Sequence, residues 1–235
     1  MNELFYEKYR KYKKKYLNYR NQLSIKNLRN LKYNTKTYLQ NVKNNNDIQY
    51  IFITGRGSMG KTHLADELGK LGFTVVHIDD IVEEIAKKHP DGIKIFALYH
   101  PGKYPKEKQE VIKIVQNVIK KNDKVVIEGL IRDKNMINQF FMGMKFQFVY
   151  VRPKSIEIYK KYLIKRFEYE IKNNLKNLSW LWDYINGEIL DDYNKFGTKS
   201  KKFIQFIEER AKEAFKRLPY HYKLYEDFDF ILVFT

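Results

Sequence analysis

One segment restricts the fold of this chain more than any other: the run GRGSMGKT at residues 55–62. It matches the phosphate-binding loop pattern G-x-x-x-x-G-K-[ST], in which backbone N–H groups of a glycine-rich turn converge on phosphate oxygens. Residues 48–54, before the run, are β-branched and aromatic over the length of a strand, and Leu64, Leu68 and Leu71 recur at helical spacing behind it. The sequence therefore predicts a strand, a phosphate-binding loop and a helix in the order that such a loop requires.

The residues of this loop have separate expected roles. Its glycines leave the backbone free to adopt positive φ and to approach a ligand, Lys61 would reach the outer phosphates of a nucleotide, and the Thr62 hydroxyl would ligate magnesium. Arg56 points either outward or toward the nucleotide base, and His63 is most simply a residue of the first helical turn. The residues predicted to contact the nucleotide are Gly55, Arg56, Gly57, Ser58, Met59, Gly60, Lys61, Thr62 and His63.

Composition limits the classes of protein to consider. The chain has 235 residues, 43% of them hydrophobic, which suffices for one sizeable domain with an appendage. It has no cysteine, so disulfides and thiolate metal sites are excluded, and its 5 histidines show no metal-ligand spacing. The only metal that we expect is one carried with a nucleotide. Without a signal-like segment or an apolar run of membrane-spanning length, we expect a soluble, cytoplasmic protein.

The basic charge of the chain, +17 in all, is concentrated near the N-terminus, where residues 1–46 hold 12 lysines and arginines against Glu3 and Glu7. Aromatic and apolar residues recur there every three or four positions, which predicts one face of a helix. They are Phe5, Tyr9, Tyr12, Tyr16, Tyr19 and Leu23. We expect this face to pack on the main domain or on a partner helix. Contact with nucleic acid and binding to a membrane surface are the alternatives.

The remainder of the chain predicts an α/β domain. Residues 33–47 are polar and rich in asparagine, which predicts a linker, so we divide the chain into an arm with linker (1–46) and a main domain (47–235) with a helical lid or insertion at about 166–217. Short apolar runs then alternate with helical patterns, as in a three-layer fold with a parallel sheet. The five expected strands are 48–54, 73–78, 124–128, 147–151 and 229–234. In such sheets the ligand lies beyond the carboxyl ends of the strands.

Carboxylates follow two of these strands at the edge where a ligand is expected. Asp79 and Asp80 follow the second strand, where a carboxylate would accept the proton of an attacking hydroxyl or help to hold magnesium. Asp80 is alternatively the cap of a helix that begins at Ile81. Glu128 ends the third strand, where it would reach magnesium through water, and Arg132 would clamp an anionic acceptor. The alternative for Glu128 is a surface ion pair.

Arginine is the rarer base in this chain, so its positions carry more information than those of lysine. Phosphoryl transfer needs fixed positive donors around the migrating group, and the planar fork of arginine supplies them better than the point charge of lysine. Arg166 lies on the helix predicted after the fourth strand, and Arg210 and Arg217 would share a face of a later helix. We expect Arg166 and Arg210 to steady the transferred group or to bind the acceptor. Each is alternatively a solvated helix residue.

In organisation, residues 48–235 resemble the nucleoside monophosphate kinases and their small-molecule kinase relatives within the P-loop superfamily. GRGSMGKT is similar to the ATP-binding loop of that family, and VVIEGLIR is similar to the segment hhhDGFPR of adenylate kinases. The resemblance implies that Glu128 stands where the family has an acidic residue, and Arg132 where an arginine binds the phosphate of the acceptor. FVYVRPKSIEIYKKYLIKR resembles the fourth strand and the following helix, whose final arginine opens the lid and matches Arg166.

The chain also departs from this family. Proline is absent from EGLIR, the stretch WLWDYINGEILDDY stands in the lid region, and no helix follows the fifth strand, so we expect the tyrosine-rich helix of the arm to cover that face. HIDDI is similar to the segment after strand two in phage polynucleotide kinase, shikimate kinase and dephospho-coenzyme A kinase, where an aspartate activates a hydroxyl. Two kinds of acceptor therefore stay open: a phosphate, which needs no general base, and a hydroxyl, which would benefit from Asp79 as one.

The expected function is an ATP- and magnesium-dependent phosphotransferase that moves the γ-phosphate to a nucleotide or nucleoside. We expect residues 90–105 to form a wall over the acceptor, with Tyr99 or Tyr104 available to stack on a base. The alternatives are a kinase of a polynucleotide 5′-hydroxyl or another small molecule, a nucleic-acid-binding NTPase that uses the arm, and a loop that binds nucleotide only structurally. KYRKYKKKYLNYR in the arm also resembles N-terminal helices of nucleocytoplasmic large DNA viruses, an origin that would place the protein in the host cytoplasm or the virion.

Overall fold

The computed structural model describes residues 32–88, 104–173, 185, 187–225, 227–228 and 230–235. The tyrosine-rich stripe of the arm, most of the expected wall at 90–105 and both tryptophans of the insertion lie outside these residues. The expectations for those segments stay predictions.

In the described part of the chain, six strands form one sheet in which all neighbours are parallel. The strands are β1 (Lys32–Asn34), β2 (Tyr50–Thr54), β3 (Thr74–His77), β4 (Val125–Glu128), β5 (Gln147–Arg152) and β6 (Phe230–Phe234). Their order is β1-β6-β5-β2-β4-β3, so the chain passes from β2 to β3 and β4 on one side and later to β5 and β6 on the other. The connections change direction at β2, and the crevice at such a switch point is where ligands bind in sheets of this kind.

The sheet contains the five predicted strands and one more. The prediction of five strands is wrong because residues 33–47, predicted as a linker, form part of β1 and helix α2 (Thr35–Asn44), and β1 pairs with β6. The polar composition was misleading for a physical reason. An edge strand of 3 residues needs no apolar pattern, and α2 buries only Tyr38 and Val42, so a short amphipathic helix is made here with few apolar residues.

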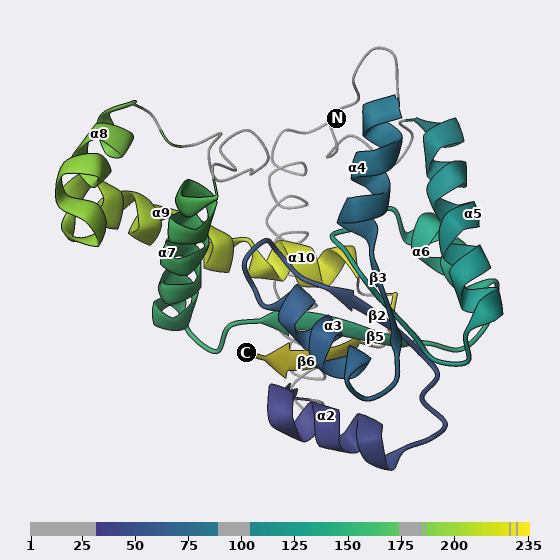
Figure 1. Cartoon of the computed structure of the whole chain (residues 1–235). Coiled ribbons are helices and arrows are strands. Elements are labelled where there is room, and N and C mark those ends of the chain that lie inside the picture. The colour runs from purple at the N-terminus through teal and green to yellow at the C-terminus, as the bar shows by residue number, and fades with distance from the viewer. Residues whose placement is uncertain (1–31, 89–103, 174–184, 186, 226, 229) are drawn as a thin grey trace, which may run out of the picture.

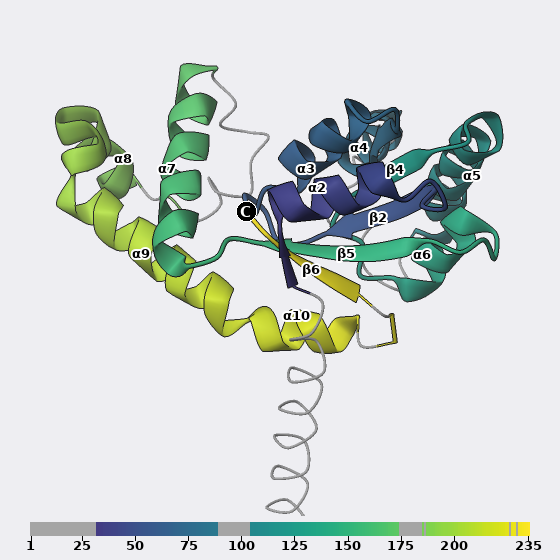
Figure 2. The same cartoon turned by 90° about the horizontal axis from the view of Figure 1, so that it is seen from below.

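Helices cover both faces of the sheet (Figures 1 and 2). On one face, α2 and α3 (Lys61–Gly69) pack against side chains that alternate along the strands, such as Ile51 and Ile53 of β2. Tyr38 is buried there, and its hydroxyl donates a hydrogen bond to Gln147 at 3.0 Å. Helix α2 lies beside β6, and the hydroxyl of its first residue, Thr35, donates to the carbonyl oxygen of Phe234 at 3.2 Å.

The opposite face carries a larger core that is rich in aromatic side chains. Phe52 of β2 and Phe148 of β5 point into it, with ring centroids 5.4 Å apart. The helices that contribute to it include α4 (Ile78–Lys88), α5 (Pro105–Lys121), α6 (Lys134–Phe141), α7 (Ile156–Lys172), α9 (Lys201–Lys216) and α10 (Leu218–Leu224). Burial of these rings on one side of β2 and aliphatic side chains on the other fixes the strand that leads into the loop.

The chain between β5 and β6 forms a helical region beside the sheet. It contains α7, α8 (Gly187–Phe196), a 3₁₀ turn (Gly197–Lys199), α9 and α10. Serine caps begin two of these helices: the Ser155 hydroxyl accepts from the amide of Ile158, and the Ser200 hydroxyl accepts from that of Phe203. In Figures 1 and 2, α7, α8 and α9 lie at the left of the picture and α4 and α5 at the right, with α3 between the two groups.

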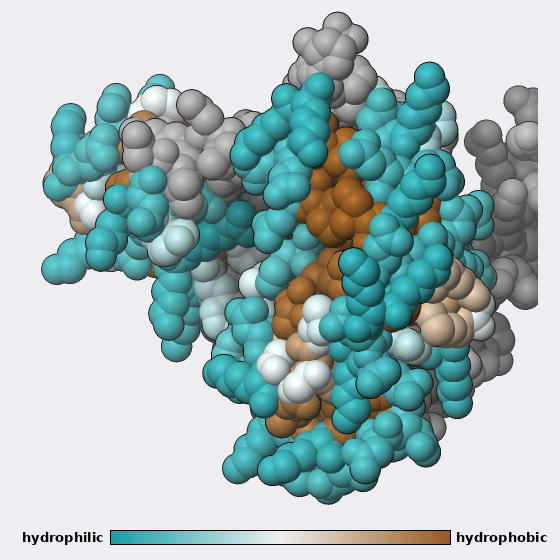
Figure 3. All heavy atoms as spheres, turned by 45° about the vertical axis from the view of Figure 1, so that its right-hand side comes forward, coloured by the Kyte–Doolittle hydropathy of each residue, from teal (hydrophilic) through white to brown (hydrophobic). Residues whose placement is uncertain are grey.

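The surface is mainly hydrophilic. Figure 3 shows charged and polar side chains over most of the face seen there, with a strip of apolar surface between them. The exposed large apolar residues in the described ranges lie on or next to separate helices; they are Met142, Tyr169, Phe196, Ile204 and Tyr220. In the described part of the chain, no helix combines the length and the apolar character needed to cross a membrane.

Candidate active site

The loop from Gly55 to Gly60 connects the end of β2 to the start of α3. Gly55 packs so closely on β5 that a Cβ atom there would lie 2.4 Å from the carbonyl oxygen of Val151, so only glycine fits without a shift of the backbone. Among the described residues, no backbone carbonyl accepts a hydrogen bond from the amides of residues 56–60, and α3 begins at its N-cap without a side-chain cap. Open amides in a tight turn and at a helix N-terminus form a binding site for phosphate.

Neighbouring segments hold this loop through its carbonyl groups. The hydroxyl of Tyr159 on α7 donates to the carbonyl oxygen of Gly57 at 2.9 Å, and the hydroxyl of Thr235 donates to that of Met59 at 3.1 Å. The Met59 side chain is fully buried in the aromatic core, so only the backbone of this predicted contact residue faces the turn. Because these bonds occupy carbonyls, they position the loop and leave its amides for a ligand.

Lys61 and Thr62 occupy the first turn of α3, as predicted. Nζ of Lys61 donates to the carbonyl oxygen of Arg56 at 3.4 Å, so the lysine lies back over the loop. The Thr62 hydroxyl donates to Oε1 of Glu128 at 3.3 Å. The structure thus brings together Thr62 and Glu128, two of the three residues predicted to hold magnesium. His63 is an exposed residue of the same helical turn.

Glu128 is a buried carboxylate, only 4% exposed, with one unpartnered oxygen. Oε1 is bonded to Thr62 and to His77, whereas Oε2 is buried without a hydrogen-bond partner. Burial by itself would raise the pKa of Glu128, but the hydrogen bond from His77 and the charge of Lys61 hold that pKa below its ordinary value, so the group is ionised.

A free carboxylate oxygen beside a threonine hydroxyl is a pair of hard oxygen donors, which suits Mg²⁺. No group of three or more histidine, aspartate or glutamate side chains in the described ranges is arranged to hold a metal alone. The pair formed by Thr62 and Glu128 therefore fits a magnesium ion that brings its remaining oxygen ligands as phosphate and water.

His77 is a residue of this site that the sequence analysis missed. It ends β3 in register with Glu128 of β4, and its Nδ1 lies 3.1 Å from Oε1 of that carboxylate. The hydrogen bond with Glu128 raises the pKa of His77 above its ordinary value, although burial opposes the shift. Its place at a strand end was visible in the sequence. The adjacency of β3 and β4, which makes it a neighbour of Glu128, was not.

The two aspartates after β3 lie in the first turn of α4, and both are exposed. Helix α4 begins at Ile78, so the prediction that Asp80 caps a helix starting at Ile81 is wrong: the helix starts directly after the strand, and Asp80 is already inside it. Acidic side chains in a first turn favour the positive end of the helix dipole. Asp79 is at the same edge of the sheet as Glu128, and its catalytic role stays a prediction.

Arginines approach the loop from the side of α7 and α9. On α7, Nε of Arg166 donates to the buried Glu170 at 2.5 Å, and its Nη1 donates to the hydroxyl of Ser58 at 3.4 Å. Arg56 points toward the end of α9, where its Nη1 donates to the carbonyl oxygen of Ala214 at 3.4 Å. Burial is the main cause that lowers the pKa of Arg56. Of the arginines predicted outside the loop, Arg166 is the one with a described hydrogen bond to it.

The positive charges of three arginines act on His221 of α10. Burial lowers the pKa of His221 to about 4, and the charges of Arg56, Arg132 and Arg217 add to this shift. Nδ1 of His221 is buried without a hydrogen-bond partner. Arg132 is half-buried in the segment between β4 and α6. A neutral histidine among three guanidinium groups marks a region of positive potential, which suits an anionic group.

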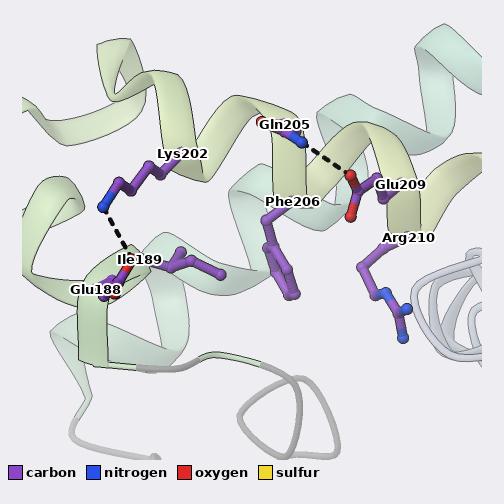
Figure 4. A pocket seen from close by; sticks show the side chains of 7 residues that line it. All are labelled: Glu188, Ile189, Lys202, Gln205, Phe206, Glu209 and Arg210. Atoms are coloured by element: carbon purple, nitrogen blue, oxygen red, sulfur yellow. Dashed lines mark hydrogen bonds and ion pairs between the residues drawn. The ribbon is translucent and has the colours of Figure 1, made fainter.

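Arg210 lies on α9, at a pocket of about 390 Å³ between α8 and α9 (Figure 4). Burial raises the pKa of Tyr159, whose hydroxyl bonds the loop, and the charges of Arg56, Arg166 and Arg210 oppose that rise. Figure 4 shows Phe206 and Arg210 extending from the same side of α9, while Lys202 is paired with Glu188 at 3.0 Å. Nη2 of Arg210 forms an ion pair with Glu213 at 2.8 Å. Glu188 and Lys202 are the charged pair within the lining of this pocket, and the catalytic role of Arg210 stays a prediction.

Comparison with known proteins gives a likeness to kinases. No family model and no curated protein matches the chain. A shikimate kinase from Acinetobacter baumannii in complex with shikimate matches with a TM-score of 0.42 and 14% identity, over 80% of this chain and 83% of that one. A shikimate kinase from Bacteroides thetaiotaomicron matches with a TM-score of 0.38 and 17% identity, over 80% and 85%. The tunicamycin resistance protein of Deinococcus radiodurans matches with a TM-score of 0.41 and 14% identity, over 73% and 95%.

The matching structures thus include P-loop small-molecule kinases, the relatives that the sequence resembles. At these TM-scores and identities the matches decide neither the reaction nor the acceptor.

Proposed function

We propose that this protein is an ATP- and magnesium-dependent phosphotransferase that moves the γ-phosphate to a nucleotide or nucleoside. The observation that carries the proposal is the contact between Thr62 and Glu128 at 3.3 Å, together with the unpartnered Oε2 of that buried carboxylate. A buried, ionised carboxylate with a free oxygen costs stability unless a cation or donor completes it. A loop that binds phosphate only for structural reasons has no need of such a group.

The residues on this side of the loop bind and orient the phosphates. The open amides of residues 56–60 and Nζ of Lys61 provide positive potential for phosphate oxygens. Thr62 and Glu128 would hold magnesium, which when bound neutralises the charge on the transferred group. Arg166, held by Glu170 and in contact with Ser58, is positioned to steady that group from the other side.

The acceptor would bind on the side of positive charge. Arg132 belongs to the arginines around His221, and an anionic acceptor gains from bidentate hydrogen bonds with such groups. A hydroxyl acceptor is the second candidate. Asp79, exposed in the first turn of α4, would accept the proton of that hydroxyl, whereas a phosphate acceptor needs no base.

The decisive experiment measures ATP consumption with a panel of nucleoside monophosphates, nucleosides, shikimate-like polyols and 5′-hydroxyl oligonucleotides. We expect turnover with a nucleotide or nucleoside, dependent on magnesium and abolished by Lys61→Ala. Turnover confined to oligonucleotides would instead support the hydroxyl-acceptor alternative. ATP binding without consumption of any acceptor would favour a structural nucleotide site.

Salt dependence separates a small acceptor from nucleic acid. Affinity for DNA or RNA through the basic arm should fall steeply as salt is added, because binding releases counterions, whereas turnover of a small acceptor should change little. Deletion of residues 1–31 provides the matched variant, since β1 and the rest of the sheet begin at Lys32. If the deletion abolishes oligonucleotide binding and leaves turnover unchanged, nucleic acid binds through the arm alone.

A further inference from the structure

The ends of two adjacent strands bring His77 and Glu128 together. These residues are register partners in the parallel pair β3 and β4, so their side chains project from the same face of the sheet. The residues that follow these two strands, Gly129 and Ile78, also pack closely. A Cβ atom at Gly129 would lie 2.9 Å from Cβ of Ile78, the first residue of α4. The pairing is therefore a property of the sheet rather than of two flexible side chains.

The direction of the hydrogen bond follows from chemistry. The carboxylate of Glu128 is ionised and can only accept, so Nδ1 of His77 carries the hydrogen and donates to Oε1 at 3.1 Å. Nε2 on the other side of the ring lies 3.8 Å from Oδ1 of Asp66, which is an electrostatic contact rather than a hydrogen bond. His77 thus uses its inner nitrogen for Glu128.

Two donors from different elements meet at one oxygen of Glu128. His77 comes from β3 and Thr62 from α3, and both donate to Oε1. The final torsion of a glutamate is broad, and one donor would leave the carboxylate free to turn. Two donors in different directions fix its plane, and Oε2 is left buried without a partner. A fixed plane means a fixed position for the one oxygen that is available to a ligand.

We infer that His77 is a positioning residue: by holding Oε1, it aims Oε2 of Glu128 at the magnesium that accompanies the nucleotide. The inference rests on the proposed function, and it deepens that function by naming a residue outside the loop motif on which metal use depends. Partners of this kind commonly change metal affinity by about 10–100-fold when they are removed, because the ligand loses its orientation.

Calorimetry of ATP binding tests this inference without a measurement of turnover. The quantity of interest is the metal-linked gain, the ratio of ATP affinity with magnesium to that with EDTA. His77→Asn keeps an N–H group near the place of Nδ1, whereas His77→Gln keeps one only near the place of Nε2. We expect His77→Asn to keep the metal-linked gain and His77→Gln to lower it by about tenfold, with ATP binding in EDTA unchanged in both.

A second step asks whether His77 acts through Glu128. In a Glu128→Gln background, His77→Gln should cause no further loss of the metal-linked gain, because the oxygen that it positions is no longer charged. Thermal unfolding of each variant checks that the fold is kept. Should His77→Gln fail to fold, His77→Ser, which removes both nitrogens, replaces it and must show the same loss.

The outcomes separate this inference from the proposed function. Wild-type protein that binds no ATP under either condition removes the proposed function. Wild-type protein with a metal-linked gain that His77→Asn and His77→Gln affect equally overturns the role of His77 alone. An additive loss in the Glu128→Gln background overturns it as well, since the histidine would then act independently of that carboxylate.

Discussion

Two histidines near the phosphate-binding loop have surroundings of opposite charge. His77 lies beside Glu128, whose hydrogen bond raises its pKa. His221 lies among Arg56, Arg132 and Arg217, and burial with their charges lowers its pKa to about 4. The pKa of a histidine is therefore raised at one place near this loop and lowered at another.

Two buried carboxylates near the loop also differ in their partners. Glu128 and Glu170 are both 4% exposed. Oε2 of Glu128 has no partner, whereas Glu170 is paired with Arg166, so that its charge is used to fix a cation. Glu128 thus offers an anionic oxygen for a metal ion, whereas Arg166, held by Glu170, offers a guanidinium group for an anion.

The largest expected effect comes from removing the charge of Glu128. Glu128→Gln keeps the shape of the side chain but not its affinity for magnesium, so we expect kcat/KM to fall about 1000-fold, or about 4 kcal/mol. Glu170→Gln, at the same exposure, is the matched variant and should lower turnover less and leave the magnesium dependence of ATP binding unchanged. Steady-state kinetics and calorimetry measure both. Equal loss of magnesium dependence in the two variants would contradict the division of roles.

His221 should make stability depend on pH. Its folded pKa of about 4 lies below the ordinary 6.5, so the folded state binds fewer protons than the unfolded state. The free energy of unfolding should therefore be highest above about pH 6.5, where His221 is neutral in both states. It should fall by about 3 kcal/mol at most as pH falls toward 4. Denaturant unfolding of wild type and His221→Gln between pH 7 and 4 measures it, and the variant should show the flatter profile. Parallel profiles would mean that this histidine titrates normally.

Arg166 should matter for turnover more than for nucleotide binding. Arg166→Lys keeps the charge but loses the fork that joins Glu170 and Ser58 at once, so we expect kcat to fall about 100-fold with little change in ATP affinity. Single-turnover kinetics and equilibrium binding separate the two quantities. A loss confined to ATP affinity would move this arginine from the transferred group to the ground-state nucleotide.

The smallest effect concerns the bond that holds the loop from α7. Tyr159→Phe removes the hydroxyl that donates to the carbonyl of Gly57, which should weaken ATP binding by about 1 kcal/mol, or roughly fivefold. Tyr162→Phe on the same helix is the matched control, because no described hydrogen bond joins Tyr162 to the loop. Calorimetry compares the two. Equal affinities in both variants would show that the loop keeps its shape without this contact.

Much of the fold followed from local patterns. The five core strands and the loop were predictable because each is encoded by a contiguous run: apolar residues of strand length, then turn-forming glycines, then helical spacing. Strand β1 and helix α2 were not predicted, because their polar sequence becomes structured only through pairing with β6 and burial of Tyr38 and Val42. Local secondary-structure propensity is a poor predictor where a few tertiary contacts supply the stability of an element.

The site divides in the same way. Lys61, Thr62 and Glu128 could be named from the sequence, since a motif or a strand end marks each one. Asp80 could not be placed correctly, because α4 begins at Ile78, directly after β3, and no local signal marks that start. His77 and His221 could not be distinguished from other histidines, because their environments are made by residues far away in the chain.

By itself, the sequence determined that a phosphate-binding loop follows a buried strand and that carboxylates and arginines stand near the ends of its strands. Only the tertiary structure decided which of these groups meet. The order of strands puts β4 and β5 on opposite sides of β2, so Glu128 at the end of β4 meets His77 of β3, whereas Arg166, on the helix that follows β5, bonds to Ser58 of the loop. Which charged groups lie within a few ångströms of one another depends on that strand order, and no local sequence pattern specifies it.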